Sequence, residues 1–138
     1  MRSFIWIFLI VIGALVVFYL SWIYSPRFEY NQFVPSWLAR WADKEENYNT
    51  RTALPLFFLG IISGLFLMFK KMKLRLWLYT WLILTLVVLI AELGQFLLPL
   101  RSSDWKDVYW GSLGAAIGLL VTYLFKFILN IKRNLNVK

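Results

Sequence analysis

Residues 4–24, FIWIFLIVIGALVVFYLSWIY, form an uncharged apolar stretch long enough to cross a bilayer. A membrane-spanning helix needs about 20 mainly apolar residues. A secretory signal peptide is the alternative, but this apolar run is long for one and no small-residue cleavage site follows it. A retained anchor is therefore favoured. With the three other stretches that qualify, the predicted spans are residues 4–24, 52–69, 76–98 and 108–131.

The composition agrees with a membrane protein. The 138 residues are 61% hydrophobic and 20% aromatic, and a soluble domain of this size cannot bury so much apolar surface. There is no Cys and no His, which removes disulfides, thiolate ligands and the commonest metal ligand and neutral-pH base. We predict one all-α domain over residues 1–138, an integral membrane four-helix bundle. No cofactor and no dedicated metal site are predicted.

The basic residues predict the orientation of the bundle. Nine of the fifteen Lys and Arg residues lie at the N-terminus, in the KKMKLR loop (residues 70–75) or in the C-terminal tail. The other six share the opposite side with all seven acids. The positive-inside rule then favours cytoplasmic N- and C-termini. The cytoplasmic charge fits anionic membrane lipids, and no nucleic-acid partner is expected because the basic groups do not form a soluble face with exposed aromatics.

The loop of residues 25–51 is the largest segment outside the predicted spans, on the outer side. It contains VPSWLARWADKEEN (residues 34–47), in which Trp37 and Trp41 lie four residues apart. This spacing puts both rings on one face of a helix. We predict a short interfacial helix here, and an irregular loop with tryptophan anchors is the alternative.

Polar residues gather between the last two spans, in AELGQFLLPLRSSDWKDVYWGSLGAAIG (residues 91–118). Glu92 and Gln95 are three residues apart and therefore share a helix face. If the helix ends near Leu98, Glu92 lies about 9–10 Å below that end, at the edge of the hydrocarbon or inside it. An ionisable group at that depth normally needs a partner, and Arg101 is the nearest along the chain.

Each acid in this stretch also has a purely structural explanation. Asp104 and Asp107 precede the fourth span, where carboxylates cap free N–H groups and complement the helix dipole. For Glu92 the structural alternative is an ion pair or a carboxyl group kept neutral by burial.

Two glycine patterns lie in the spans, at Gly60-x-x-x-Gly64 and Gly114-x-x-x-Gly118. Such pairs let helix backbones approach closely. They predict either packing within the bundle or a homo- or hetero-oligomer formed through these faces.

The polar stretch, with its spacing across a loop, resembles the VanZ-like family. The residues that carry the resemblance are Glu92, Gln95, Pro99, Arg101, Asp104, Asp107, Gly114 and Gly118. The DKEEN segment is similar to another motif of that family at Asp43, Lys44 and Asn47. There are two departures, because the family's usual His falls on Asn47 and its usual Asn falls on Gly111. Asn47 cannot shuttle a proton near neutral pH.

The resemblance implies a small multi-pass protein of the bacterial cytoplasmic membrane, in a family whose founding member is linked to glycopeptide-antibiotic resistance. We predict that it binds or handles an anionic lipid or a lipid-linked cell-wall precursor at the outer leaflet. Lys44 and Arg101 would contact the phosphate. The complete predicted ligand-binding set is Asp43, Lys44, Asn47, Glu92, Gln95, Arg101, Asp104 and Asp107.

Two other functions stay open. One is an intramembrane enzyme acting on a lipid carrier, with Glu92 and Asp107 as candidate catalytic residues and Arg101 stabilising negative charge. In that reading Asp104 and Asp107 would hold a divalent cation. The other is a structural subunit of a membrane complex, in which the charges only fix the fold. Four helices in a short chain leave little room for a substrate cavity, which favours this last reading somewhat.

Overall fold

The computed structural model describes residues 2–23, 27–99 and 103–135. Four helices are long and apolar enough to cross a membrane. All regular elements of the described residues are helical, which confirms the predicted all-α bundle. In chain order the elements are α1 (Arg2–Trp22), η1 (Phe28–Tyr30), α2 (Ser36–Ala42), η2 (Glu45–Asn47), α3 (Tyr48–Phe69), α4 (Leu74–Gln95) and α5 (Trp105–Leu135).

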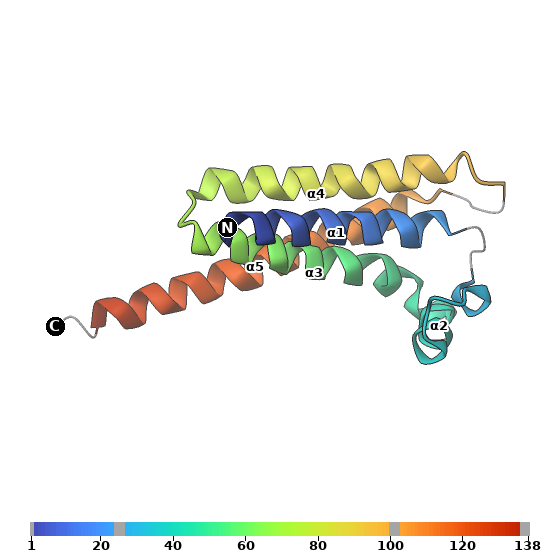
Figure 1. Ribbon diagram of the computed structural model, residues 1–138, viewed down its shortest axis with the longest axis horizontal. Coiled ribbons are helices and arrows are strands. Elements are labelled where there is room, and N and C mark those ends of the chain that lie inside the picture. The colour runs from blue at the N-terminus through green and yellow to red at the C-terminus, as the bar shows by residue number, and fades with distance from the viewer. Residues whose placement is uncertain (1, 24–26, 100–102, 136–138) are drawn as a thin grey trace.

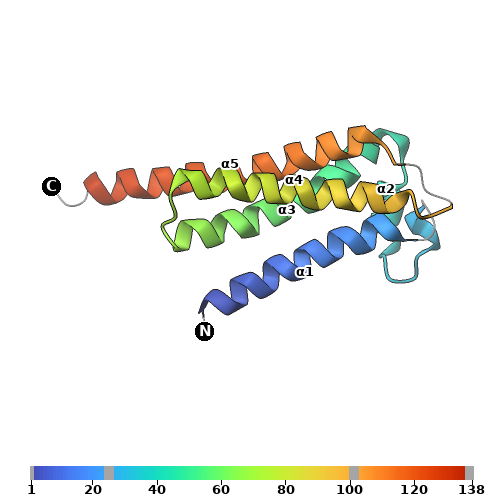
Figure 2. The ribbon, with the colours of Figure 1, turned by 90° about the horizontal axis from the view of Figure 1, so that it is seen from above.

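The four long helices run alternately in opposite directions (Figure 1). Both α1 and α5 pack on the pair formed by α3 and α4, and α3 with α5 makes the most extensive interface. The N-terminal half of α1 diverges from the other helices (Figure 2). The alternating directions place α2 and all seven Asp and Glu residues at one end of the bundle, which we call the acidic end. The turn between α3 and α4, with its Lys and Arg residues, lies at the opposite end, which we call the basic end.

Glycines allow α3 and α5 to pack backbone against backbone. A Cβ atom at Gly118 would meet the carbonyl oxygen of Phe57, and one at Gly60 would lie 2.6 Å from that of Ala115. At Gly64 it would meet the hydroxyl of Thr122. The two glycine pairs are thus buried in one intramolecular interface. Of the two predicted roles of the glycines, this is packing within the bundle. Oligomer formation stays a prediction.

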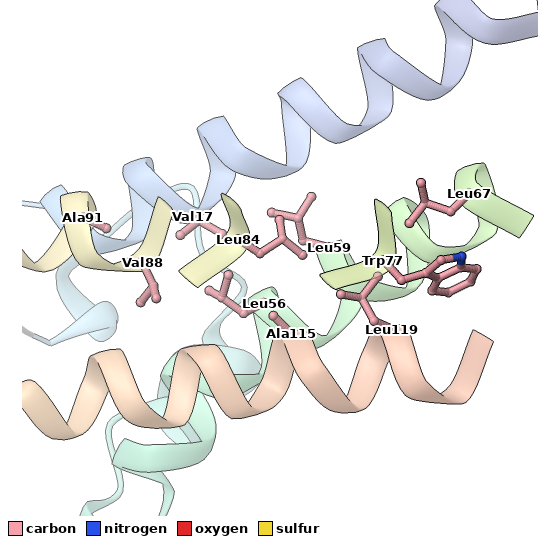
Figure 3. Packing of buried hydrophobic residues seen from close by; sticks show 10 residues of the cluster. All are labelled: Val17, Leu56, Leu59, Leu67, Trp77, Leu84, Val88, Ala91, Ala115 and Leu119. Carbon is pink, nitrogen blue, oxygen red and sulfur yellow. The ribbon is translucent and has the colours of Figure 1, made fainter. Parts of the chain in front are cut away.

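The interior of the bundle is apolar. Buried residues from α1, α3, α4 and α5 meet in one cluster, with Leu56, Leu59 and Val88 the largest of its fully buried side chains (Figure 3). The outward faces are apolar as well, and Phe8, Ile83 and Phe127 are each more than half exposed. This pattern fits a bundle whose sides face lipid rather than water.

The helix ends differ from the predicted span ends. Helix α3 begins at Tyr48 rather than near 52, and α5 runs on to Leu135, because a helix does not stop where its apolar part stops. Helix α4 ends at Gln95 rather than near Leu98. Its final carbonyls accept i→i+3 bonds, including one of 2.9 Å from Leu98 N–H to the Gln95 oxygen. Pro99 has no N–H with which to continue the helix.

The predicted short helix in the first loop is present as α2. Ala39 and Ala42 are buried on one side, in a cluster with Ile23 and Phe28. Trp37 is 67% exposed on the other side, and Trp41 is half-buried. The loop therefore has its own small core, and contact of Trp37 with a membrane surface stays a prediction.

Candidate functional site

A small polar cavity lies inside the acidic end of the bundle. Its volume is about 40 Å³, and α1, η1, α3, α4 and α5 all contribute to its wall. A buried water needs about 10–15 Å³ on this scale, so the cavity accommodates a few waters or one small polar group. The polar side chains in its wall are Ser21, Arg51, Thr52, Glu92, Gln95 and Asp107.

Glu92 and Gln95 form the α4 side of this cavity. Their residues are only 3% and 5% exposed, and Gln95 Nε2 donates to Glu92 Oε1 at 2.9 Å. The backbone N–H of Asp104 donates to Glu92 Oε2 at 3.3 Å. The predicted shared face is confirmed. Because α4 ends at Gln95, Glu92 lies only about 4.5 Å from the helix end, which corrects the predicted depth of 9–10 Å.

Arg51 brings a cation to the same cavity from the first turn of α3. Its guanidinium lies 5.1 Å from the ring centroids of Phe28 and Tyr48, and Nη1 lies 3.9 Å from Asp43 Oδ1. The Arg51 side chain is only 19% exposed. Cation–π contacts of this kind strengthen when the cation is partly desolvated. The guanidinium is therefore held at the cavity wall by its surroundings.

Asp43 fastens the first loop over the cavity. Its two carboxylate oxygens accept the backbone N–H groups of Phe28 and Glu29, each at 2.9 Å. Phe28 is itself buried and lines the cavity. Asp43 thus positions both the aromatic cover and Arg51, although its own side chain is not in the described wall.

We expect Asp43→Ala to lower the stability of the folded protein by about 2 kcal/mol. Hydrogen bonds to a charged acceptor contribute about 1.5–3 kcal/mol. The substitution removes a part-buried bond from Phe28 and an exposed bond from Glu29, and the exposed bond contributes little. Thermal unfolding in detergent, followed by tryptophan fluorescence, measures the change. Asp43→Asn keeps one acceptor oxygen, so its unfolding midpoint should lie between those of wild type and Asp43→Ala. Equal unfolding midpoints for Asp43→Ala and wild type would contradict the positioning role.

Pro55 interrupts the helical hydrogen bonding of α3 beside the cavity. It lies inside the helix and lines the cavity together with Thr52 and Leu56. Proline has no N–H to donate to the carbonyl four residues earlier, which belongs to Arg51. The carbonyl oxygen of Arg51, the residue that supplies the cation, therefore receives no helical hydrogen bond from residue 55.

The two acids before α5 have different places. Asp107 lies in the first turn of α5 and lines the cavity. The Asp104 side chain is directed to the helix start, where Oδ1 accepts the N–H of Lys106 at 2.9 Å. Capping therefore accounts for the Asp104 carboxylate, as the structural alternative expected, and only its backbone N–H reaches Glu92. This placement does not support an Asp104–Asp107 cation site, and among the described residues no three acidic, His or Cys side chains are grouped so that they could hold a metal ion.

Lys44 and Asn47 do not line the cavity. Lys44 is exposed and lies 3.7 Å from Glu46, which is also exposed. Asn47 Nδ2 donates to the carbonyl of Trp41 at 2.8 Å, so its amide ties η2 to α2. Arg101 lies outside the described residues. A side chain at Gly111 would come within 2.7 Å of Val88 Cγ2, so a residue larger than glycine there requires Val88 to move.

Arg51 is the main site residue that the sequence reasoning missed. It is the last residue of the predicted loop, directly before the predicted span of residues 52–69. The available signal was its position, because a charge directly at a span boundary on the same side as Glu92 needs a partner. Phe28, Ser21 and Thr52 carry no comparable signal, since nothing in their spacing links them to α4.

The arrangement combines a cation, carboxylates and an amide at the end of an apolar bundle. Arg51 can donate to a phosphate or carboxylate through a planar fork of N–H groups. Glu92 and Asp107 can accept from hydroxyl, amide or ammonium groups. A small polar head attached to an apolar body fits such a position.

Comparison with known proteins supports the resemblance drawn from the motifs. A family model described as VanZ/LLP1 matches residues 4–126, which is nearly the whole chain and includes the first span. No curated protein and no solved structure matches the chain.

Proposed function

The chain belongs to the VanZ/LLP1 family, and we propose that it binds or handles an anionic lipid or a lipid-linked envelope precursor at the acidic end of the bundle. The protein would lie in the bacterial cytoplasmic membrane with both termini inside, so that this end faces the outer leaflet. Any link to glycopeptide-antibiotic resistance would act through such a precursor.

The observation that carries the proposal is that Arg51, Glu92 and Asp107 line one cavity between helices whose sides are apolar. The mixture of charges matches a headgroup that carries both a phosphate and hydrogen-bond donors. Arg51 would take the phosphate, and the carboxylates with Gln95 would accept from hydroxyl or amide groups. The volume of about 40 Å³ admits only one such group, so the rest of the headgroup would lie at the mouth.

Replacing Arg51 by Gln is expected to reduce lipid retention about tenfold, as befits the loss of a charge-assisted hydrogen bond. The measurement is native mass spectrometry of the protein in mild detergent, with a polyprenyl phosphate and phosphatidylglycerol added in turn. Arg51→Lys keeps the charge without the fork and should retain an intermediate amount.

The matched control is Lys44→Gln. It removes the same charge at the same end of the bundle, but from an exposed side chain outside the cavity. It should leave retention close to that of wild type. If Arg51→Gln and wild type retain the same lipids, the headgroup site is wrong and the structural-subunit alternative gains.

A catalytic function is the second candidate, and the buried Glu92 carboxylate in the same cavity as Asp107 favours it. In that case water would hydrolyse the added polyprenyl phosphate to polyprenol and inorganic phosphate, or its pyrophosphate form to polyprenyl phosphate and inorganic phosphate. Glu92→Gln should stop this conversion while the lipid remains bound. An unchanged lipid mass after prolonged incubation would leave binding as the better description.

A further inference from the structure

A groove lies between α4 and α5 toward the basic end of the bundle, opposite the cavity. Its volume is about 410 Å³, within the range of about 300–1,000 Å³ that is usual for ligand sites. The lining is almost wholly apolar. It includes Leu74, Trp77 and Trp81 from α4, and Ala116, Leu120 and Tyr123 from α5.

An ammonium group is fixed beside this groove. Lys126 Nζ donates to the carbonyl of Met72 at 3.1 Å, in the turn that precedes α4. It also lies 5.5 Å from the ring centroid of Trp77 and 5.6 Å from that of Tyr123, and both rings line the groove. A lysine ammonium has three N–H donors. The contact with Met72 and the two rings hold this cation in one place at the border of an apolar surface.

The residues around Lys126 are basic and would attract a negatively charged group. Lys70, Lys71, Lys73 and Arg75 are all exposed in the same turn or at the start of α4. All seven acidic residues of the chain lie at the other end of the bundle. A positive end next to an apolar groove is complementary to a molecule with a phosphate and a hydrocarbon chain.

We propose that this groove binds an acidic glycerophospholipid of the membrane, with an acyl chain between α4 and α5 and the phosphate on Lys126. A second copy of the chain or another apolar helix would also cover the groove. Neither would use the fixed ammonium, since burying it against an apolar surface costs free energy. The site is separate from the cavity at the acidic end and does not depend on the function proposed for that cavity.

Brominated lipids provide the test, because bromine quenches the fluorescence of nearby tryptophans such as Trp77 and Trp81. The protein is reconstituted into phosphatidylcholine vesicles with increasing fractions of brominated phosphatidylglycerol or brominated phosphatidylcholine. Phosphatidylglycerol should quench at a mole fraction about fivefold lower, the preference expected from one cation near the surface. Lys126→Gln should abolish this preference and Lys126→Arg should keep it.

Lys106→Gln is the control for net charge, because it removes an exposed lysine at the acidic end. It should keep the preference of wild type. Ala116→Leu fills the groove without altering charge, and it should weaken quenching by both lipids. Equal quenching by the two lipids in wild type, or a preference that survives Lys126→Gln, would overturn the proposal. Loss of the preference in Lys106→Gln would also overturn it, because net charge alone would then account for the effect.

Discussion

Gly118→Ala and Gly114→Ala are each expected to destabilise the bundle by about 3 kcal/mol, at the upper end of the usual cost of overpacking. Alanine favours a helix by about 1 kcal/mol over glycine, so propensity alone predicts the opposite sign. The clash decides the outcome. A Cβ at Gly118 would meet the Phe57 carbonyl oxygen and come within 2.9 Å of the Ile61 nitrogen, and one at Gly114 would meet the Ala53 oxygen. Backbone atoms cannot rotate away, so α3 and α5 would have to separate.

Thermal unfolding in detergent measures this effect, and Gly13→Ala is its matched control. The same substitution in α1 would place Cβ 2.8 Å from Leu59 Cδ1, the end of a flexible side chain. Leu59 is buried, but its side chain can shift where a backbone atom cannot, so Gly13→Ala should cost much less than Gly114→Ala or Gly118→Ala. If all three variants have the same unfolding midpoint as wild type, the close packing of α3 against α5 is wrong.

The same variants separate the two readings of the glycine pairs. If the glycines formed an interface between copies of the chain, their substitution would shift the oligomer distribution in size-exclusion chromatography. The thermal unfolding midpoint of the monomer would then stay unchanged. Packing within one chain predicts a lower midpoint at every protein concentration. The structure supports the second outcome, because all four glycines are buried against the same chain.

The fold was predictable because hydropathy alone marks helices that must satisfy their own backbone hydrogen bonds in lipid. The four helices and α2 follow from that rule and from the spacing of Trp37 and Trp41. Their ends were less predictable. Hydropathy cannot show that the polar segment from Tyr48 to Arg51 is already helical, or that the chain tightens after Gln95.

The candidate site was predictable where its residues are neighbours on one helix. Glu92 and Gln95 share a face by spacing alone, and their hydrogen bond confirms it. Arg51 reaches the same cavity only through the packing of α3, α4 and α5, which no local pattern encodes. The sequence predicts Lys44 and Arg101 as the cations, and the structure leaves Lys44 exposed beside Glu46.

Glu92→Ala is expected to destabilise the protein by about 2–3 kcal/mol, since it removes the acceptor of two hydrogen bonds at a buried position. Gln95 Nε2 and the N–H of Asp104 both donate to this carboxylate. Each buried donor that loses its partner costs about 1–3 kcal/mol. Glu92→Gln keeps one acceptor oxygen and should cost about half as much. The unfolding midpoint in detergent again provides the measurement.

Glu46→Ala is the matched control, because Glu46 is an exposed acid at the same end, and surface pairs contribute at most about 1 kcal/mol. An unfolding midpoint for Glu92→Ala as high as that of Glu46→Ala would show that the Glu92 carboxylate is not a buried, hydrogen-bonded group. The double variant Glu92→Leu, Gln95→Leu then separates stability from function. Replacing both side chains by apolar groups of similar size restores part of the stability, because Gln95 no longer presents an unpaired amide and only the N–H of Asp104 still loses its acceptor. A double variant that is stable but retains no lipid would show that the Glu92–Gln95 pair takes part in binding, whereas full lipid retention would show that the pair serves only to stabilise the fold.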